Sequence, residues 1–196
     1  MRTITFILLL ALIPFLGIAQ TWSKEQLTKA NTVKDIDFLT DAEKEAILYI
    51  NLARLYPKDF ASIVVANYFG TERYGDYLKD SEYRKSLITH LNSMQPVGAL
   101  VFEMELYENA KCFAKEQGEA GTIGHDRINC PKGNYAECCS YGMDKGIDIA
   151  MQWLIDDKVP SLGHRINCLN GSYTKVGISV NYHKAWQNCA VADFIW

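Results

Sequence analysis

The chain has 196 residues, of which 48% are hydrophobic and 22% are charged. This length suits a single domain, and the composition is that of a globular protein and not of a disordered chain. The formal net charge of −3 lacks the basic excess that nucleic-acid-binding proteins carry, which argues against nucleic acid as a partner.

The first residues have the layout of a secretory signal peptide. A positive start is followed by an almost wholly apolar run over residues 4–18, and Gly17 and Ala19 place small residues where signal peptidase requires them. We therefore expect residues 1–19 to be removed and the mature chain to begin at Gln20. The apolar run is short for a membrane-spanning helix, and a retained membrane anchor is the alternative. No later segment is apolar enough to span a bilayer, so we expect a soluble protein that is secreted or periplasmic.

The next part of the chain predicts a lead-in segment and then a capped helix. Residues 20–42 are mixed and polar, and we expect the folded domain to cover residues 43–196. Thr40 and Glu43 fit a capping box, in which the hydroxyl and the carboxylate bind exposed backbone N–H groups at the start of a helix. The helix should end before Pro57, because the residue that precedes a proline disfavours the helical conformation.

Apolar periodicity predicts further helices and then strands along the rest of the chain. The predicted helices cover about residues 81–94, 102–119 and 147–154, and the predicted strands cover 135–141, 176–182 and 190–194. Loops are expected over residues 62–80 and 122–134, with a hairpin connection over residues 183–187. Helices come first and strands late, without alternation, which favours an α+β fold with an antiparallel sheet over a doubly wound parallel sheet.

The common catalytic signatures are absent from the sequence. It contains no HExxH zinc-protease motif, no GxSxG nucleophile elbow and no glycine-rich phosphate loop. Side chains capable of chemistry instead gather between residues 124 and 165, where His125 and His164 accompany several carboxylates, among them Glu137 and Asp156. Such a set can form a metal or acid–base site, or a buried polar network that holds loops to the sheet.

Several short motifs, in order and at consistent spacing, resemble those of a known family. Residues 124–125 (GH) look like its first histidine motif, and residues 136–142 (AECCSYG) look like its GEN strand. Residues 153–178 resemble the W..S..HR.N ending of bacterial members, while residues 50–54 (INLAR) and 106–114 resemble two of its helices. Over roughly residues 43–196, the chain is identified as a member of the CAP superfamily, or SCP domain, which includes cysteine-rich secretory proteins, antigen 5 and pathogenesis-related proteins.

The resemblance implies an α–β–α sandwich, with a small antiparallel sheet between helical layers. It also implies a cleft lined by His125, His164, Glu137 and Asp156, the last standing where relatives carry a glutamate. The two imidazoles would hold zinc or another divalent cation, and the two carboxylates would orient the imidazoles or bind metal-coordinated water. Because an imidazole must be neutral to bind a metal, the affinity should fall at acidic pH.

The same resemblance leaves several functions open. The first is a secreted, non-enzymatic binding module, with an extracellular ligand that is a lipid or a protein. The second is a structural polar cluster with the function elsewhere, the third is a metal-assisted hydrolase of the peptidase type, and a lipid or sterol carrier is a further alternative. No catalytic residue is assigned, and we expect a monomer without a transmembrane segment in the mature chain.

The cysteines, six in all, suggest three disulfides in an exported chain. Cys138 and Cys139 are neighbours on a predicted strand, so they should point to opposite faces and have different partners. Because Cys139 shares a face with Glu137 and Cys168 lies one helical turn after His164, convergence of the cleft would make Cys139–Cys168 the leading pair. Cys130–Cys138 and Cys112–Cys189 would then complete the set.

Overall fold

The computed structural model describes residues 21–196, so the expected signal peptide and its cleavage site lie outside the described residues. The helices are α1 (Lys24–Ala30), α2 (Asp41–Leu55), α3 (Pro57–Ile63), α4 (Glu82–Ser93), α5 (Met104–Ala120), α6 (Gly146–Ile155) and α7 (Gly163–Leu169), with a 3-10 turn η1 (Val65–Asn67). The strands are β1 (Val101–Phe102), β2 (Ala136–Tyr141), β3 (Lys175–His183) and β4 (Gln187–Ile195). Within residues 21–196, no helix combines the length and the apolarity needed to cross a membrane.

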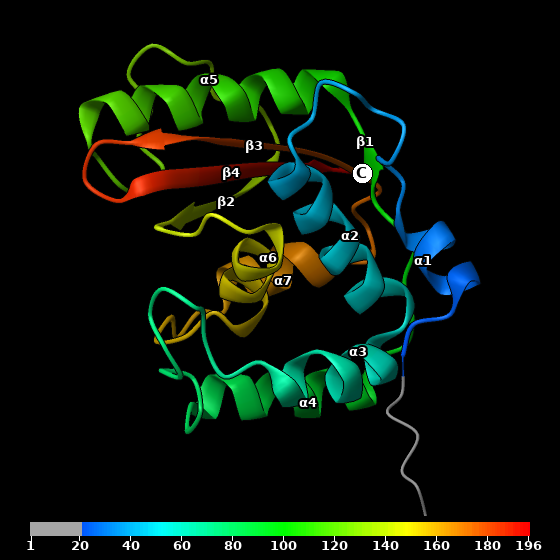
Figure 1. Cartoon of the computed structure of the whole chain (residues 1–196). Helices are drawn as coiled ribbons and strands as arrows, with labels where there is room; N and C mark the ends of the chain where they lie inside the picture. Colours follow the sequence, from blue (N-terminus) through cyan, green and yellow to red (C-terminus); the bar gives the residue numbers. More distant parts are fainter. Residues whose placement is uncertain (1–20) are drawn as a thin grey trace, which may run out of the picture.

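The strands form one sheet in the order β1-β3-β4-β2. β4 pairs antiparallel with both β2 and β3, as expected, whereas the very short β1 pairs parallel with β3 and makes the sheet mixed. Helix α5 covers one face of the sheet, while α2, α6 and α7 lie on the other side, with α3 and α4 beyond them (Figure 1). The predicted α+β fold is confirmed.

The capping box at the start of α2 is confirmed and also ties this helix to the sheet. The Glu43 N–H donates to the Thr40 hydroxyl, and one Glu43 carboxylate oxygen accepts the Thr40 N–H at 2.8 Å. The other oxygen accepts the Val180 N–H of β3 at 2.9 Å. The helix ends at Leu55, and Pro57 begins α3, where its missing N–H costs no helical hydrogen bond.

Two glycines let α5 approach β3 closely. A Cβ atom at Gly177 of β3 would overlap the α5 backbone at Leu106 and Tyr107, and a Cβ atom at Gly118 of α5 would overlap the Tyr182 carbonyl. Both residues therefore lie where the backbones of helix and strand are in direct contact. This contact fixes the height of α5 above the sheet.

Two buried polar side chains of α2 hold distant segments in place. The Asn51 carboxamide accepts the Leu100 N–H at 2.7 Å and donates to the Ala30 carbonyl at 3.0 Å. The fully buried Arg54 guanidinium donates to the carbonyls of Gly98, Cys168, Asn170 and Tyr173, at 2.7–2.9 Å. Burial lowers the pKa of Arg54 to about 10. Arg54 thereby anchors the C-terminal end of α7.

Most predicted elements are present, with ends shifted by a few residues, but α1, α3, β1 and α7 were not expected. The segment predicted as a lead-in contains α1, which begins with its own capping box between Ser23 and Gln26 and packs on α2. Helix α7 is short, and its first residues directly follow the loop after α6. Apolar periodicity over so few residues is too brief to separate a helix from a loop.

Candidate functional site

A cleft of about 410 Å³ opens beside β2, between the loop of residues 122–134 and the connection from α6 to α7. Of the residues expected in a cleft, His125, Asp156 and His164 line it, and Glu137 lies behind His125. Its lining combines these polar groups with apolar side chains: Leu78, Ile123, Met151 and Ile155.

Asp156 holds His164 from the end of α6. Its Oδ1 lies 2.7 Å from the His164 Nδ1, and its Oδ2 accepts the backbone N–H groups of His164 and Arg165 at 3.0 and 3.3 Å. Asp156 has left-handed backbone angles (φ 56°), a conformation that aspartate tolerates better than most residues. This turn points the carboxylate at the start of α7, so a side chain shorter than glutamate reaches the imidazole.

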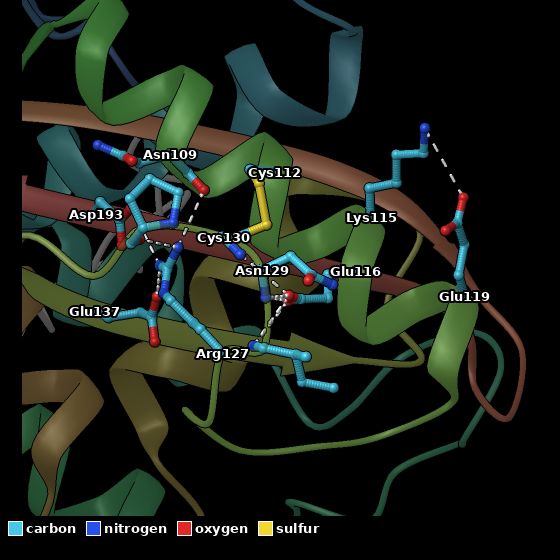
Figure 2. The surroundings of a disulfide bond; sticks show 12 residues. Asn109, Cys112, Lys115, Glu116, Glu119, Arg127, Asn129, Cys130, Glu137 and Asp193 are labelled. Carbon is cyan, nitrogen blue, oxygen red and sulfur yellow. Dashed lines mark hydrogen bonds and ion pairs between the residues drawn. A yellow bond between two sulfur atoms is a disulfide. The ribbon is translucent and has the colours of Figure 1, made fainter.

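The loop that carries His125 is fastened to α5 at two points. A disulfide joins Cys112 of α5 to Cys130 of the loop. The Glu116 carboxylate, one turn further along α5, accepts the backbone N–H groups of Ile128, Asn129 and Cys130 at 2.7–3.2 Å (Figure 2). These hydrogen bonds, with that of Asn129 the strongest, lower the pKa of Glu116.

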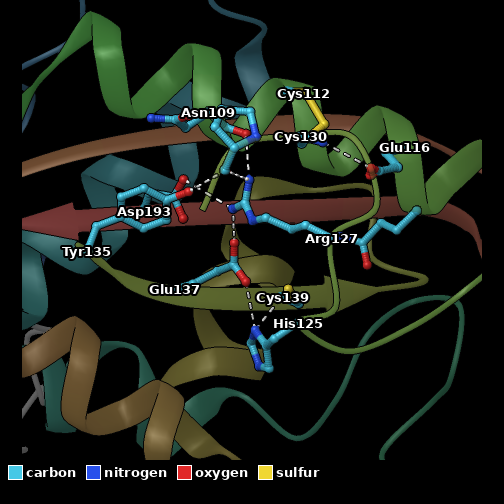
Figure 3. Close-up of polar contacts among 12 residues, drawn as sticks. Asn109, Cys112, Glu116, His125, Arg127, Cys130, Tyr135, Glu137, Cys139 and Asp193 are labelled. Carbon is cyan, nitrogen blue, oxygen red and sulfur yellow. Dashed lines mark hydrogen bonds and ion pairs between the residues drawn. A yellow bond between two sulfur atoms is a disulfide. The ribbon is translucent and has the colours of Figure 1, made fainter. Parts of the chain in front are cut away.

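The half-exposed His125 side chain is held by Glu137 of β2. Its Nδ1 lies 2.8 Å from the Glu137 Oε1, and the other Glu137 oxygen accepts from the Arg127 guanidinium (Figure 3). A carboxylate partner assigns the proton to Nδ1. Both histidines of the cleft thus present the same arrangement, with a carboxylate at Nδ1, which leaves Nε2 available to a ligand.

Arg127 is a positioning residue that sequence reasoning missed. Its side chain is only 3% exposed, it donates to the Pro131 carbonyl at 3.1 Å, and its guanidinium carbon lies 4.3 Å from the centre of the Phe113 ring. The guanidinium that binds Glu137 is therefore held in place by a hydrogen bond and by a packed aromatic ring. The available signal was a basic residue two positions after His125 in the same loop.

Asp193 is a second residue that the sequence did not single out. It lies opposite Glu137 in the β2–β4 register and is fully buried. Burial, and then the Glu137 charge, raise the pKa of Asp193 to about 8, although Arg127 Nη2, at 3.6 Å from Oδ2, acts in the opposite direction. Asp193 alternates with Ala192 and Phe194 along β4, so it points to the opposite face of the sheet, which α5 covers.

The disulfide pattern corrects the expected one. The Cys112–Cys130 bond excludes Cys130–Cys138 and Cys112–Cys189, because the loop of residues 122–134 places Cys130 against α5. Cys139–Cys168 is also wrong. Alternation on β2 directs Cys139 toward the α5 side, into a cluster with Cys189, while Cys138 faces the core cluster that contains Cys168. In this structure, Cys138, Cys139, Cys168 and Cys189 are free thiols.

His125, Glu137 and Cys139 form a group that could hold a metal ion, with ligand atoms within 4.8 Å of one another. The Cys139 Sγ lies 3.8 Å from the His125 Nδ1 and donates to the Gly124 carbonyl at 3.4 Å. Burial first, and then Glu137, raise the pKa of Cys139 to about 12. A histidine that activates a thiol contacts the thiol through one ring nitrogen and its orienting carboxylate through the other. In His125, Cys139 and Glu137 both contact Nδ1, so this arrangement is not present. A nucleophilic cysteine is therefore not supported.

Arg165 stabilises the wall of the cleft through backbone carbonyls. Its guanidinium donates to the carbonyls of Leu154, Ile155 and Tyr83 at 2.7–2.9 Å. The Asp157 carboxylate accepts from the Ser81 hydroxyl at 2.5 Å. A guanidinium has several donors in a fixed plane, so it joins two carbonyls at the C-terminal end of α6 to one in the first turn of α4.

Comparisons with known proteins identify the family to which the chain belongs. Among the solved structures, an outer surface protein from Borrelia burgdorferi is similar, with 21% sequence identity and a TM-score of 0.41, over 57% of this chain and 86% of that one. No curated protein matches the sequence. The model of the cysteine-rich secretory protein family, CAP, matches residues 49–196, a span that includes the cleft, the sheet and most of the helices. The chain therefore belongs to the CAP family of cysteine-rich secretory proteins.

Proposed function

We propose that this protein is an extracellular, non-enzymatic binding module whose cleft holds a divalent metal ion between His125 and His164. One observation carries the proposal: each imidazole has a carboxylate at Nδ1, Glu137 at 2.8 Å and Asp156 at 2.7 Å. Metal-binding histidines usually donate one ring N–H to a carboxylate, which fixes the ring and makes the other nitrogen a better ligand.

The donor set fits a divalent ion of the zinc type. Neutral imidazole nitrogen suits zinc, copper and nickel, and waters would complete the coordination. A catalytic zinc site usually has three protein ligands and one open position, whereas His125 and His164 provide two. This difference favours binding over hydrolysis.

The group of His125, Glu137 and Cys139 is the competing ligand set. Its thiol has a raised pKa of about 12 and already donates to the Gly124 carbonyl, so metal binding there must displace a proton at neutral pH. Glu137 is also held by Arg127. Both features favour the imidazole pair.

Cobalt substitution distinguishes the two ligand sets. With Co²⁺ bound, the imidazole pair predicts a spectrum without a thiolate-to-metal charge-transfer band, and Cys139→Ser should leave the spectrum unchanged. The variant His164→Ala should abolish the cobalt spectrum. A charge-transfer band that disappears in Cys139→Ser would assign the metal to the competing set.

Export is supported by the signal-peptide pattern of residues 1–19 and by the Cys112–Cys130 disulfide, since disulfides persist in oxidising compartments. The intact mass of the protein recovered outside the cytoplasm tests this part. A mature chain that begins at Gln20 is expected, and full-length protein in the soluble extracellular fraction would contradict it.

The apolar wall of the cleft favours a second candidate, a carrier of an apolar or amphipathic ligand. Leu78, Met151 and Ile155 line the cleft, and Ile123 lies at it with 63% of its surface exposed. Organic extraction of the purified protein, followed by mass spectrometry, should then release a lipid. Ile123→Glu should reduce the amount, while Ile128→Glu, on a more exposed residue outside the cleft lining, should not. Equal lipid in both variants would remove this candidate.

A further inference from the structure

The thiols of Cys138 and Cys168 form a feature that the proposed metal site does not use. Cys138 lies on β2 and Cys168 on α7, and these two elements pack against each other. Neither side chain has any exposed surface, and both belong to the same core cluster. The two cysteines are therefore close in space although they belong to different elements.

The contacts of Cys138 place its sulfur against the turn of α7 that carries Cys168. The Cys138 Sγ lies 3.8 Å from the His164 carbonyl oxygen and 3.7 Å from the Asn167 Nδ2. In an α-helix, the carbonyl of a residue accepts the N–H of the residue four positions later, so the His164 carbonyl that Cys138 contacts lies next to the backbone N–H of Cys168. Burial raises the pKa of the Cys138 thiol, and a hydrogen bond with the Cys168 thiol raises it further.

We propose that Cys138 and Cys168 form a second disulfide in the exported protein, in addition to Cys112–Cys130. The inference does not depend on the proposed metal site. A bond between these residues would join the two walls of the cleft. Cys138 follows Glu137, which holds His125, and Cys168 lies one turn after His164.

The oxidant is a disulfide, either of a thiol–disulfide oxidoreductase or of a small thiol such as glutathione. One cysteine thiolate attacks this disulfide, which forms a mixed disulfide and releases one thiol. The second cysteine then attacks the mixed disulfide, forms the Cys138–Cys168 bond and releases the second thiol. Two cysteine thiols are oxidised, one disulfide is reduced, and both protons pass to the leaving thiolates. Because both side chains are buried in the folded protein, the exchange takes place before α7 packs on β2.

The remaining thiols, Cys139 and Cys189, lie on the side of the sheet that α5 covers and have separate partners. The Cys139 Sγ donates to the Gly124 carbonyl at 3.4 Å, and the Cys189 Sγ donates to the Ala114 carbonyl at 3.2 Å. Cys139 is paired with Val191 across the ladder, so Cys189 is its diagonal neighbour and not its direct one. Both thiols should therefore stay reduced.

The test is alkylation of the full chain after export into an oxidising compartment. The purified protein is denatured in the presence of an alkylating reagent, digested without reduction and mapped by mass spectrometry. We expect alkylation at Cys139 and Cys189 alone, and a linked peptide pair joined through Cys138 and Cys168. Alkylation of Cys138 and Cys168 in the wild-type protein, or a bond from either to another cysteine, would overturn the proposal.

Two variants assign the bond within the Cys138-Cys139 pair, since both lie in one peptide. In Cys168→Ser, Cys138 should become alkylated. In Cys139→Ser, the matched control, the linked peptides should remain. Loss of the linked peptides in Cys139→Ser would show that Cys139 and not Cys138 is the bonded residue, which contradicts the proposal.

Discussion

The Asp156 carboxylate binds both the side chain and the backbone of His164. One carboxylate oxygen lies 2.7 Å from the ring Nδ1, and the other accepts the backbone N–H at 3.0 Å. The same carboxylate thus orients the imidazole and fixes the first turn of α7. Because Asp156 lies at the end of α6, the position of the ring depends on the packing of α6 and α7.

Asp156→Asn should weaken zinc binding by about 10–100-fold, the usual effect of removing the carboxylate partner of a metal-binding histidine. The amide keeps the size of the side chain and an acceptor oxygen, so the fold should survive. Isothermal titration calorimetry with zinc measures the change. Asp157→Asn is the matched control, because Asp157 also lines the cleft but its carboxylate accepts from Ser81. Similar losses in both variants would indicate a general effect of charge.

Arg54→Met should destabilise the protein strongly. The guanidinium donates to carbonyls from several segments, and a methionine would leave these buried acceptors without donors. We expect the free energy of unfolding to fall by about 3 kcal/mol or more, as measured by urea denaturation. Arg73→Met, on an exposed residue, should change it by less than about 0.5 kcal/mol. A loss below about 1 kcal/mol in Arg54→Met would contradict the anchoring role.

Removal of the Cys112–Cys130 bond should lower stability and loosen the His125 loop. The bond closes a loop with a sequence separation of 18, for which chain entropy predicts a loss of roughly 3 kcal/mol. The double variant Cys112→Ser/Cys130→Ser, compared with wild type by urea denaturation, checks this value. Hydrogen exchange at Ile128 and Asn129 should also rise, although Glu116 still accepts their N–H groups. Unchanged stability and exchange would show that Glu116 alone holds the loop.

Asp193 should make the metal-free protein less stable as the pH rises. Its pKa is raised to about 8 in the folded state, against about 4 for an ordinary aspartate. The folded state therefore binds the proton more tightly than the unfolded state does. This stabilisation is fully present below pH ~4 and is lost as the pH rises through about 8.

Asp193→Asn keeps a neutral side chain at every pH. The decrease in the free energy of unfolding between pH ~5 and ~8, measured with a chelator present, should be smaller in Asp193→Asn than in wild type by roughly 1–3 kcal/mol. Asp126→Asn, in the exposed part of the His125 loop, should follow the wild-type curve. Parallel curves for wild type and Asp193→Asn would show that Arg127 keeps Asp193 charged.

The sequence was informative where a feature is local. Thr40 and Glu43 form the capping box that their spacing indicates, and the strand alternation separates Cys138 from Cys139 as expected. These features depend on residues that are close in the sequence, so a local sequence pattern predicts them.

Features that depend on tertiary packing were either not predicted or predicted wrongly from the sequence. The partner of Cys130 depends on where a long loop folds, and the burial of Asp193 depends on α5 covering the outer face of β4. Helix α7 is a short helix held by Arg54 and by Asp156, so its existence depends on tertiary hydrogen bonds more than on its own periodicity. No spacing rule within the chain encodes these contacts.

The most direct test of the central claim is zinc titration calorimetry on wild type and on His125→Ala/His164→Ala. The proposed site predicts one zinc ion per wild-type chain, weaker binding at acidic pH because the imidazoles must be neutral, and no detectable binding by the double variant. The variant should still fold, as circular dichroism would show. Equal zinc binding by wild type and the folded double variant would contradict the claim.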